Sequence, residues 1–101
     1  MKNKGYNLAI YLDELWEKGF KLKDDQIRFI YFGKQYTGAV DFWVIVAVSA
    51  TIRIKYQFDG SYYMAILELF SQEKPKTKKQ AWRILEKRGV LPTKQNKIRN
   101  G

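Results

Sequence analysis

One stretch, from Ala39 to Phe70, constrains the fold more than any other part of the chain. β-Branched and aromatic residues dominate it, and such side chains favour the pleated, packed surface of a sheet. Within it, Asp59-Gly60 separates two apolar runs. Asp-Gly at such a place is the strongest short hairpin signal, because a type I′ turn needs positive φ at both central residues. The stretch therefore predicts an antiparallel sheet at the centre of the fold.

The predicted sheet has about four strands, at residues 26–32, 39–48, 51–58 and 61–70. Segment 39–48 is apolar on both faces, as expected of a central strand that is covered on both sides. With Asp59-Gly60 as a two-residue loop, Tyr56 and Tyr63 face each other on the core side of the last hairpin. The opposite face then carries two cations, an amide and a tyrosine: Arg53, Lys55, Gln57 and Tyr62.

Two helices are predicted to flank the sheet. The first begins after Asn7, a favourable N-cap residue, and carries Trp16 on its apolar stripe. The second opens with a capping box of Thr77 and Gln80 and carries Trp82 on its apolar side. Both indole rings are therefore expected to be buried against the sheet.

These elements predict a single α+β domain over residues 1–92, followed by a flexible basic tail over 93–101. The domain consists of an N-terminal helix, an antiparallel sheet of about four strands and a C-terminal basic helix. A chain of 101 residues has the length of one domain. The tail is expected to be flexible because Ile98 is its one apolar residue.

Basic charge is concentrated in the last third of the chain, and the formal net charge is +9. Residues 1–70 hold nine Lys or Arg and eight Asp or Glu, whereas residues 71–101 hold ten and two. Such asymmetry indicates an anionic partner, most often nucleic acid. The alternative is a basic tail that only keeps the protein in solution.

Cations that share a surface with aromatic rings predict a nucleic-acid-binding site. Bases stack on the rings while the cations meet phosphates, which favours single-stranded DNA or RNA over duplex. The candidates on the sheet are Arg53, Lys55, Gln57 and Tyr62, and a preceding loop adds Lys34 and Tyr36. The C-terminal helix adds Lys78, Lys79, Arg83, Lys87 and Arg88. The alternative for each residue is a packed tyrosine or a lysine that solvates an outer face.

Chemistry that depends on cysteine or histidine is excluded, since the sequence contains neither. This removes disulfides, thiolate nucleophiles, the commonest general base and the commonest zinc ligand. The sequence contains no catalytic motif. We therefore expect a protein that is not an enzyme and that uses no cofactor and no metal ion.

The predicted layout of a helix, a hairpin and two further strands is similar to the restriction-endonuclease-like fold. The resemblance implies an Asp on one strand and Glu-x-Lys on the next, which together hold a divalent metal ion. Asp41 and Lys55 match this pattern. The chain departs from it at Arg53, which stands where the second carboxylate belongs, because a cation cannot ligate a metal ion.

Two further interpretations remain open. A helix-turn-helix would occupy residues 81–98, with its recognition helix opening at Thr93. A small modulator or inhibitor would occlude a partner protein, or pair as a homodimer, through open strand edges. Small size and lysine richness agree with a phage or mobile-element origin for such a modulator.

The sequence shows neither a secretory signal nor a membrane span. No apolar segment follows the polar N-terminus, and the longest apolar run, Phe42–Val48, is far shorter than a spanning helix. We therefore expect a cytoplasmic protein with no membrane partner.

Overall fold

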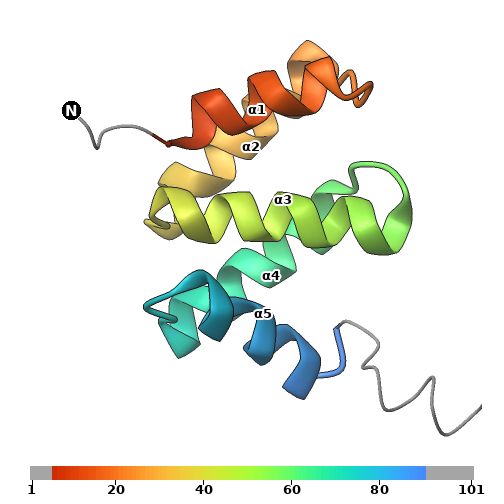
Figure 1. Cartoon of the computed structure of the whole chain (residues 1–101). Coiled ribbons are helices and arrows are strands. Elements are labelled where there is room, and N and C mark those ends of the chain that lie inside the picture. Colours follow the sequence, from red (N-terminus) through yellow and green to blue (C-terminus); the bar gives the residue numbers. More distant parts are fainter. Residues whose placement is uncertain (1–5, 91–101) are drawn as a thin grey trace, which may run out of the picture.

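The computed structural model describes residues 6–90, which form five α-helices and no strand (Figure 1). The helices are α1 (Leu8–Glu17), α2 (Asp24–Thr37), α3 (Asp41–Lys55), α4 (Gly60–Glu73) and α5 (Lys78–Lys87). The predicted α+β class and its antiparallel sheet are therefore wrong. The tail predicted over 93–101 lies outside the described residues.

Helix α3 is the centre of the fold, and each of the other four helices packs against it (Figure 1). Its buried residues occupy all sides of the helix: Val44, Ile45, Val46, Ala47, Val48, Ala50, Thr51 and Ile52. The one hydroxyl among them, on Thr51, donates to the Ala47 carbonyl at 2.8 Å. A helix that is apolar all round is stable only inside a core. The run 39–48 predicts a central strand because periodicity alone does not separate a doubly covered strand from a buried helix.

Asp59 and Gly60 start helix α4 instead of turning a hairpin. Asp59 is the N-cap residue, and its Oδ1 accepts the backbone N–H of Tyr62 at 3.1 Å. Asp is as favourable at an N-cap as it is in a turn, so this dipeptide fits both structures. Without the hairpin, the predicted faces no longer apply. Tyr63 is fully buried, as predicted, but Tyr56 is 86% exposed.

The two predicted helices are present as α1 and α5. The Asn7 side chain accepts the backbone N–H of Ile10 at 3.0 Å, which confirms the predicted N-cap. The segments of the expected sheet instead form α2, α3 and α4, and both α1 and α5 pack against α3. Trp82 is partly buried, but Trp16 is 50% exposed, so its predicted burial is wrong. Within residues 6–90, no helix combines the length and the apolar character needed to cross a membrane.

Helices α2 and α4 approach each other closely at Gly33. A Cβ atom at Gly33 would lie 2.8 Å from Cε2 of Tyr63 and 3.2 Å from Cδ1 of Leu67. The Tyr63 hydroxyl donates to the Ile30 carbonyl on α2 at 2.6 Å, and burial raises the pKa of this phenol. Glycine is therefore required here for close packing, although its φ angle is an ordinary helical one.

Replacing Gly33 by Ala should destabilise the protein by about 1–3 kcal/mol, because the added methyl group overpacks a buried contact. In an open helical position the same change would stabilise by about 0.5–1 kcal/mol. Urea unfolding followed by circular dichroism measures the difference. Gln35→Ala, at an exposed position of the same helix, is the control and should change stability by less than about 0.5 kcal/mol. A gain in stability for Gly33→Ala would contradict the packing described here.

Candidate nucleic-acid interface

Helix α5 is fixed against the core through its start and one face. The Thr77 hydroxyl accepts the backbone N–H of Gln80 at 3.1 Å, as the capping pattern predicts. Before the helix, the carbonyl of Pro75 accepts the indole N–H of Trp43 on α3 at 2.9 Å. Ala81 and Leu85 are fully buried. These contacts leave the opposite face of α5 in solvent.

Three cations form a row on the exposed face of α5: Lys79, Arg83 and Lys87. Their spacing of four residues places them on one side of the helix. None of the three forms an ion pair with a carboxylate in the part of the chain that the structure describes. We call these three residues the α5 cation row.

The other two predicted cations of this helix have local contacts. Arg88 forms an ion pair with Glu73 at the end of α4. Lys78 lies over the ring of Tyr6, with its Nζ 5.5 Å from the ring centroid. These two are exposed but already have neighbours, so they contribute less free charge than the α5 cation row.

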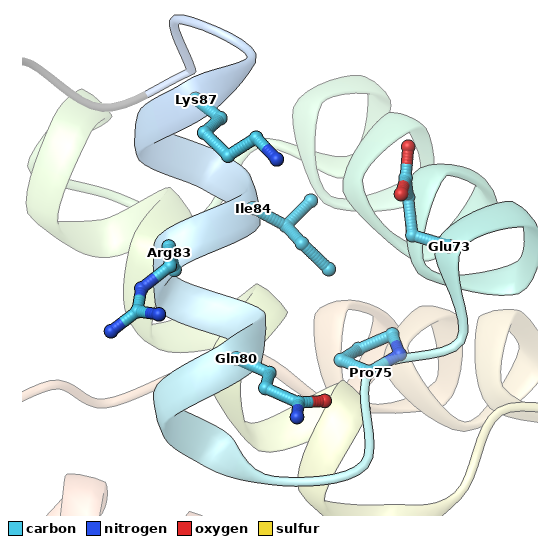
Figure 2. Close-up of a pocket in the computed structure, with 6 residues that line it drawn as sticks. All are labelled: Glu73, Pro75, Gln80, Arg83, Ile84 and Lys87. Atoms are coloured by element: carbon cyan, nitrogen blue, oxygen red, sulfur yellow. The ribbon is translucent and has the colours of Figure 1, made fainter.

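A shallow hollow of about 200 Å³ lies between α5 and the end of α4 (Figure 2). Figure 2 shows Ile84 and Lys87 directed toward this hollow, Glu73 and Pro75 across from them, and Arg83 directed away. The hollow combines an isoleucine side chain with charges of both signs. None of the residues that line it is aromatic, so a base would have no ring to stack on at this site.

Three cations outside α5 lie over aromatic rings. Arg53 lies 4.8 Å from the ring centroid of Trp82, which joins the end of α3 to α5. Lys55 lies 5.3 Å from the ring centroid of Tyr62 on α4. Lys21 lies 4.3 Å from the ring centroid of Trp16. Cations over ring faces are stabilised by the ring quadrupole while they remain reachable from solvent.

The structure places four of the residues that the sequence predicts as a site close together. Arg53, Lys55 and Gln57 lie at or just after the end of α3, and Tyr62 lies in the first turns of α4. Contact between Arg53 and Trp82 connects this group with α5. They meet at the α3–α4 connection, however, and not on a sheet face.

Lys34 and Tyr36 are not part of this surface. Both lie on α2, where Lys34 forms an ion pair with Asp41 at 3.4 Å. Tyr36 stacks on Phe32 with ring centroids 5.5 Å apart. We therefore leave both out of the proposed interface.

Tyr62 is held in place by contacts within the fold. Its hydroxyl donates to the Val90 carbonyl at 2.9 Å, burial raises its pKa, and the ring packs against the core. Its role is therefore to hold the end of α5 and to support Lys55. The exposed aromatic residue at this connection is Tyr56, which sequence reasoning missed because it pointed inward in the predicted hairpin.

Residues 2–91 match a family described as of unknown function (DUF6123). The chain belongs to this family. No curated protein and no solved structure gives a significant match. Membership assigns no activity, so the surface side chains themselves must indicate the function.

The nuclease resemblance is not supported, because its residues are not brought together. Asp41 and Lys55 are the first and last residues of α3, about 20 Å apart along a helix that rises 1.5 Å per residue. Asp41 Oδ2 instead accepts the backbone N–H of Leu8 at 3.0 Å, at the start of α1. Residues 6–90 contain no group of three acidic side chains placed to hold a metal ion. The second helix of the helix-turn-helix alternative, from Thr93, lies outside the described residues.

Replacing Asp41 by Ala should destabilise the fold by about 1–2 kcal/mol, because the Leu8 N–H would lose a charged acceptor. Thermal and urea unfolding measure this effect. Lys34→Gln removes only the partly exposed ion pair and should cost less than about 1 kcal/mol. Equal stability of Asp41→Ala and the wild type would show that Asp41 does not hold α1.

Proposed function

We propose that this protein binds nucleic acid, with α5 lying against the phosphate backbone. The observation that carries the proposal is the α5 cation row, whose three charges are exposed and have no acidic partner within residues 6–90. Phosphate contacts supply most of the affinity of sequence-independent binding and need cations that are free to meet them. The three cations leave the helix at successive turns, with Lys87 directed toward the hollow and Arg83 away from it (Figure 2), and so spread positive charge over a strip of the α5 surface.

The charge around α5 supports the same partner. Residues 74–90 hold seven Lys or Arg and one acidic residue, Glu86. Arg53 extends this positive surface onto the end of α3 through its contact with Trp82. Lys55, nearby at the same end of the helix, is paired with Asp59 at 4.0 Å and contributes less free charge. A local positive potential of this kind attracts polyanions and speeds their association.

The proposed role is binding without catalysis and without a cofactor. We place it in the cytoplasm, where both DNA and RNA are accessible. Binding by a charge row carries little information about base sequence, since phosphates are the same at every position. Low sequence specificity is therefore part of the proposal.

Replacing the α5 cation row by Lys79→Gln, Arg83→Gln and Lys87→Gln should weaken binding to a labelled duplex oligonucleotide. The slope of log affinity against log salt should become shallower by up to about 2.7, since each phosphate contact contributes about 0.9. Fluorescence anisotropy between about 50 and 200 mM salt measures the slope.

The matched control is Lys18→Gln with Lys23→Gln and Arg28→Gln, which removes the same charge from exposed positions at the end of α1 and on the first turns of α2. Its salt slope on duplex should equal that of the wild type. Equal effects of the two triple variants would mean that net charge, and not α5, governs binding. No binding of the wild type to any nucleic acid at low salt would overturn the proposed function.

The second candidate function is binding of a partner protein. An exposed aromatic stack on α2 favours it: Phe32 and Tyr36 are 52% and 69% exposed and lie against each other. Exposed apolar surface of this kind marks protein contacts, including contacts between two copies of a chain.

Phe32→Ser with Tyr36→Ser would leave nucleic-acid affinity unchanged. If the wild type sediments as a dimer and this variant as a monomer, α2 forms the contact between the two copies.

A further inference from the structure

A second hollow, of about 200 Å³, lies where the α1–α2 connection meets the α3–α4 connection. Aromatic side chains line it from both connections: Phe20 from the first, Tyr56 and Phe58 from the second. Gln26, Gln57 and Lys21 supply polar side chains to the lining. The ammonium group of Lys21 is exposed and donates to the Trp16 carbonyl at 3.3 Å. The Oε1 atom of Gln26 already accepts the Lys23 N–H at 2.9 Å, which leaves its amino group as the available donor.

The backbone at Tyr56 is unusual for the position it holds. Tyr56 ends α3 in the left-handed conformation, with φ 63° and ψ 12°, and its N–H donates to the Ile52 carbonyl at 2.8 Å. Glycine takes this conformation without a steric penalty, and Gly19, Gly38 and Gly89 do so after three other helices of this chain. A tyrosine pays a steric cost there, and its ring is too exposed to recover that cost through burial. Residues held in strained conformations concentrate at functional sites.

Three cations lie between this hollow and the α5 cation row or at the hollow itself: Lys21, Lys55 and Arg53. Lys21 lines the hollow and lies over Trp16 on one side of it. Lys55 directly precedes Tyr56 and is paired with Asp59 at 4.0 Å, with both side chains partly exposed. Arg53, two residues before Lys55, lies over Trp82 of α5. Cations and aromatic rings therefore lie near one another around the end of α3, between the hollow and α5.

We propose that this hollow binds an unpaired base of a single-stranded nucleic acid, which stacks on the ring of Tyr56. The proposal rests on the proposed function and assigns it a strand preference. Lys21 and Lys55 contact the phosphates on either side of the base, and the strand continues along Arg53 to the α5 cation row.

The lining fits a base better than other ligands. A base offers a flat π-face to an aromatic ring and polar edges to the amides of Gln26 and Gln57. Its phosphates match the charge of the surrounding lysines, as in other single-strand-binding surfaces. Paired bases are stacked inside a duplex and do not reach such a hollow.

The test compares Tyr56→Gly with Tyr56→Phe. Glycine removes the ring and relieves the backbone, so this variant should melt at the same temperature as the wild type or higher. Its affinity for a labelled oligothymidine of about 12 nucleotides should fall by about 5- to 150-fold, the usual loss on removal of one stacking ring. Tyr56→Phe keeps the ring and should bind within about two-fold of the wild type.

Two controls separate stacking from other effects. Lys74→Gly, at the end of α4, changes the second non-glycine residue with positive φ among residues 6–90. It removes at most one phosphate contact, so the slope of log single-strand affinity against log salt should change by no more than about 0.7. A duplex of the same length should bind wild type and Tyr56→Gly equally. Unchanged single-strand affinity of Tyr56→Gly, or equal losses on both strand types, would overturn the proposal while leaving the proposed function in place. Failure of the wild type to bind either probe would overturn both.

Discussion

The burial of α3 on all sides is the constraint on which the rest of this structure depends. Its valines, isoleucines and alanines require four covering helices, and a chain of 101 residues has little else to supply. α2 and α4 cover it together, and their close contact at Gly33 depends on the absence of a side chain there. The buried Thr51 hydroxyl is satisfied within the helix. The partly buried polar groups of Trp43 and Ser49 are satisfied by the Pro75 carbonyl and the Tyr11 hydroxyl.

The middle of α3 is buried, so this helix meets solvent mainly at its ends. Its charged residues lie at these two ends. At the first end, Asp41 holds the start of α1 through the Leu8 N–H. At the last end, Arg53, Lys55 and Tyr56 emerge beside α5 and the α1–α2 connection. Asp41, which stabilises the fold, and the cations proposed to bind phosphate therefore lie at opposite ends of α3. This separation is why Asp41 and Lys55 cannot belong to one nuclease site.

The sequence predicts the elements whose signals are local. Asn7 and Thr77 cap helices in the structure as they do in the sequence-based prediction, since a cap depends only on residues within one turn. The apolar run before Val48 carries no such signal, because helix and strand are equally compatible with an uninterrupted apolar segment. Asp59-Gly60 fits both a turn and a helix start, and only the surrounding elements decide between them.

The difference between local signals and contacts between distant elements also explains how much of the candidate site could be predicted. Arg53, Lys55 and Gln57 stay together in either secondary structure, because they are within five positions of one another. The direction of each side chain depends on the type of element, so the predicted roles of Tyr56 and Tyr62 were exchanged between core and surface. The contacts of Lys34 with Asp41 and of Trp82 with Arg53 join distant parts of the chain, and no local pattern indicates them.

Helix α5 is held at both of its ends, and this has a consequence for the entropy of binding. Trp43 holds the Pro75 carbonyl before the helix, and Tyr62 holds the Val90 carbonyl after it. The backbone beneath the α5 cation row is thus ordered before any ligand arrives. Binding then requires the ordering of a few side chains only, whereas a basic segment that folds on its ligand loses affinity to the ordering of its whole backbone. In the proposed complex, the spacing of the backbone positions that carry these charges is therefore set before a polyanion binds.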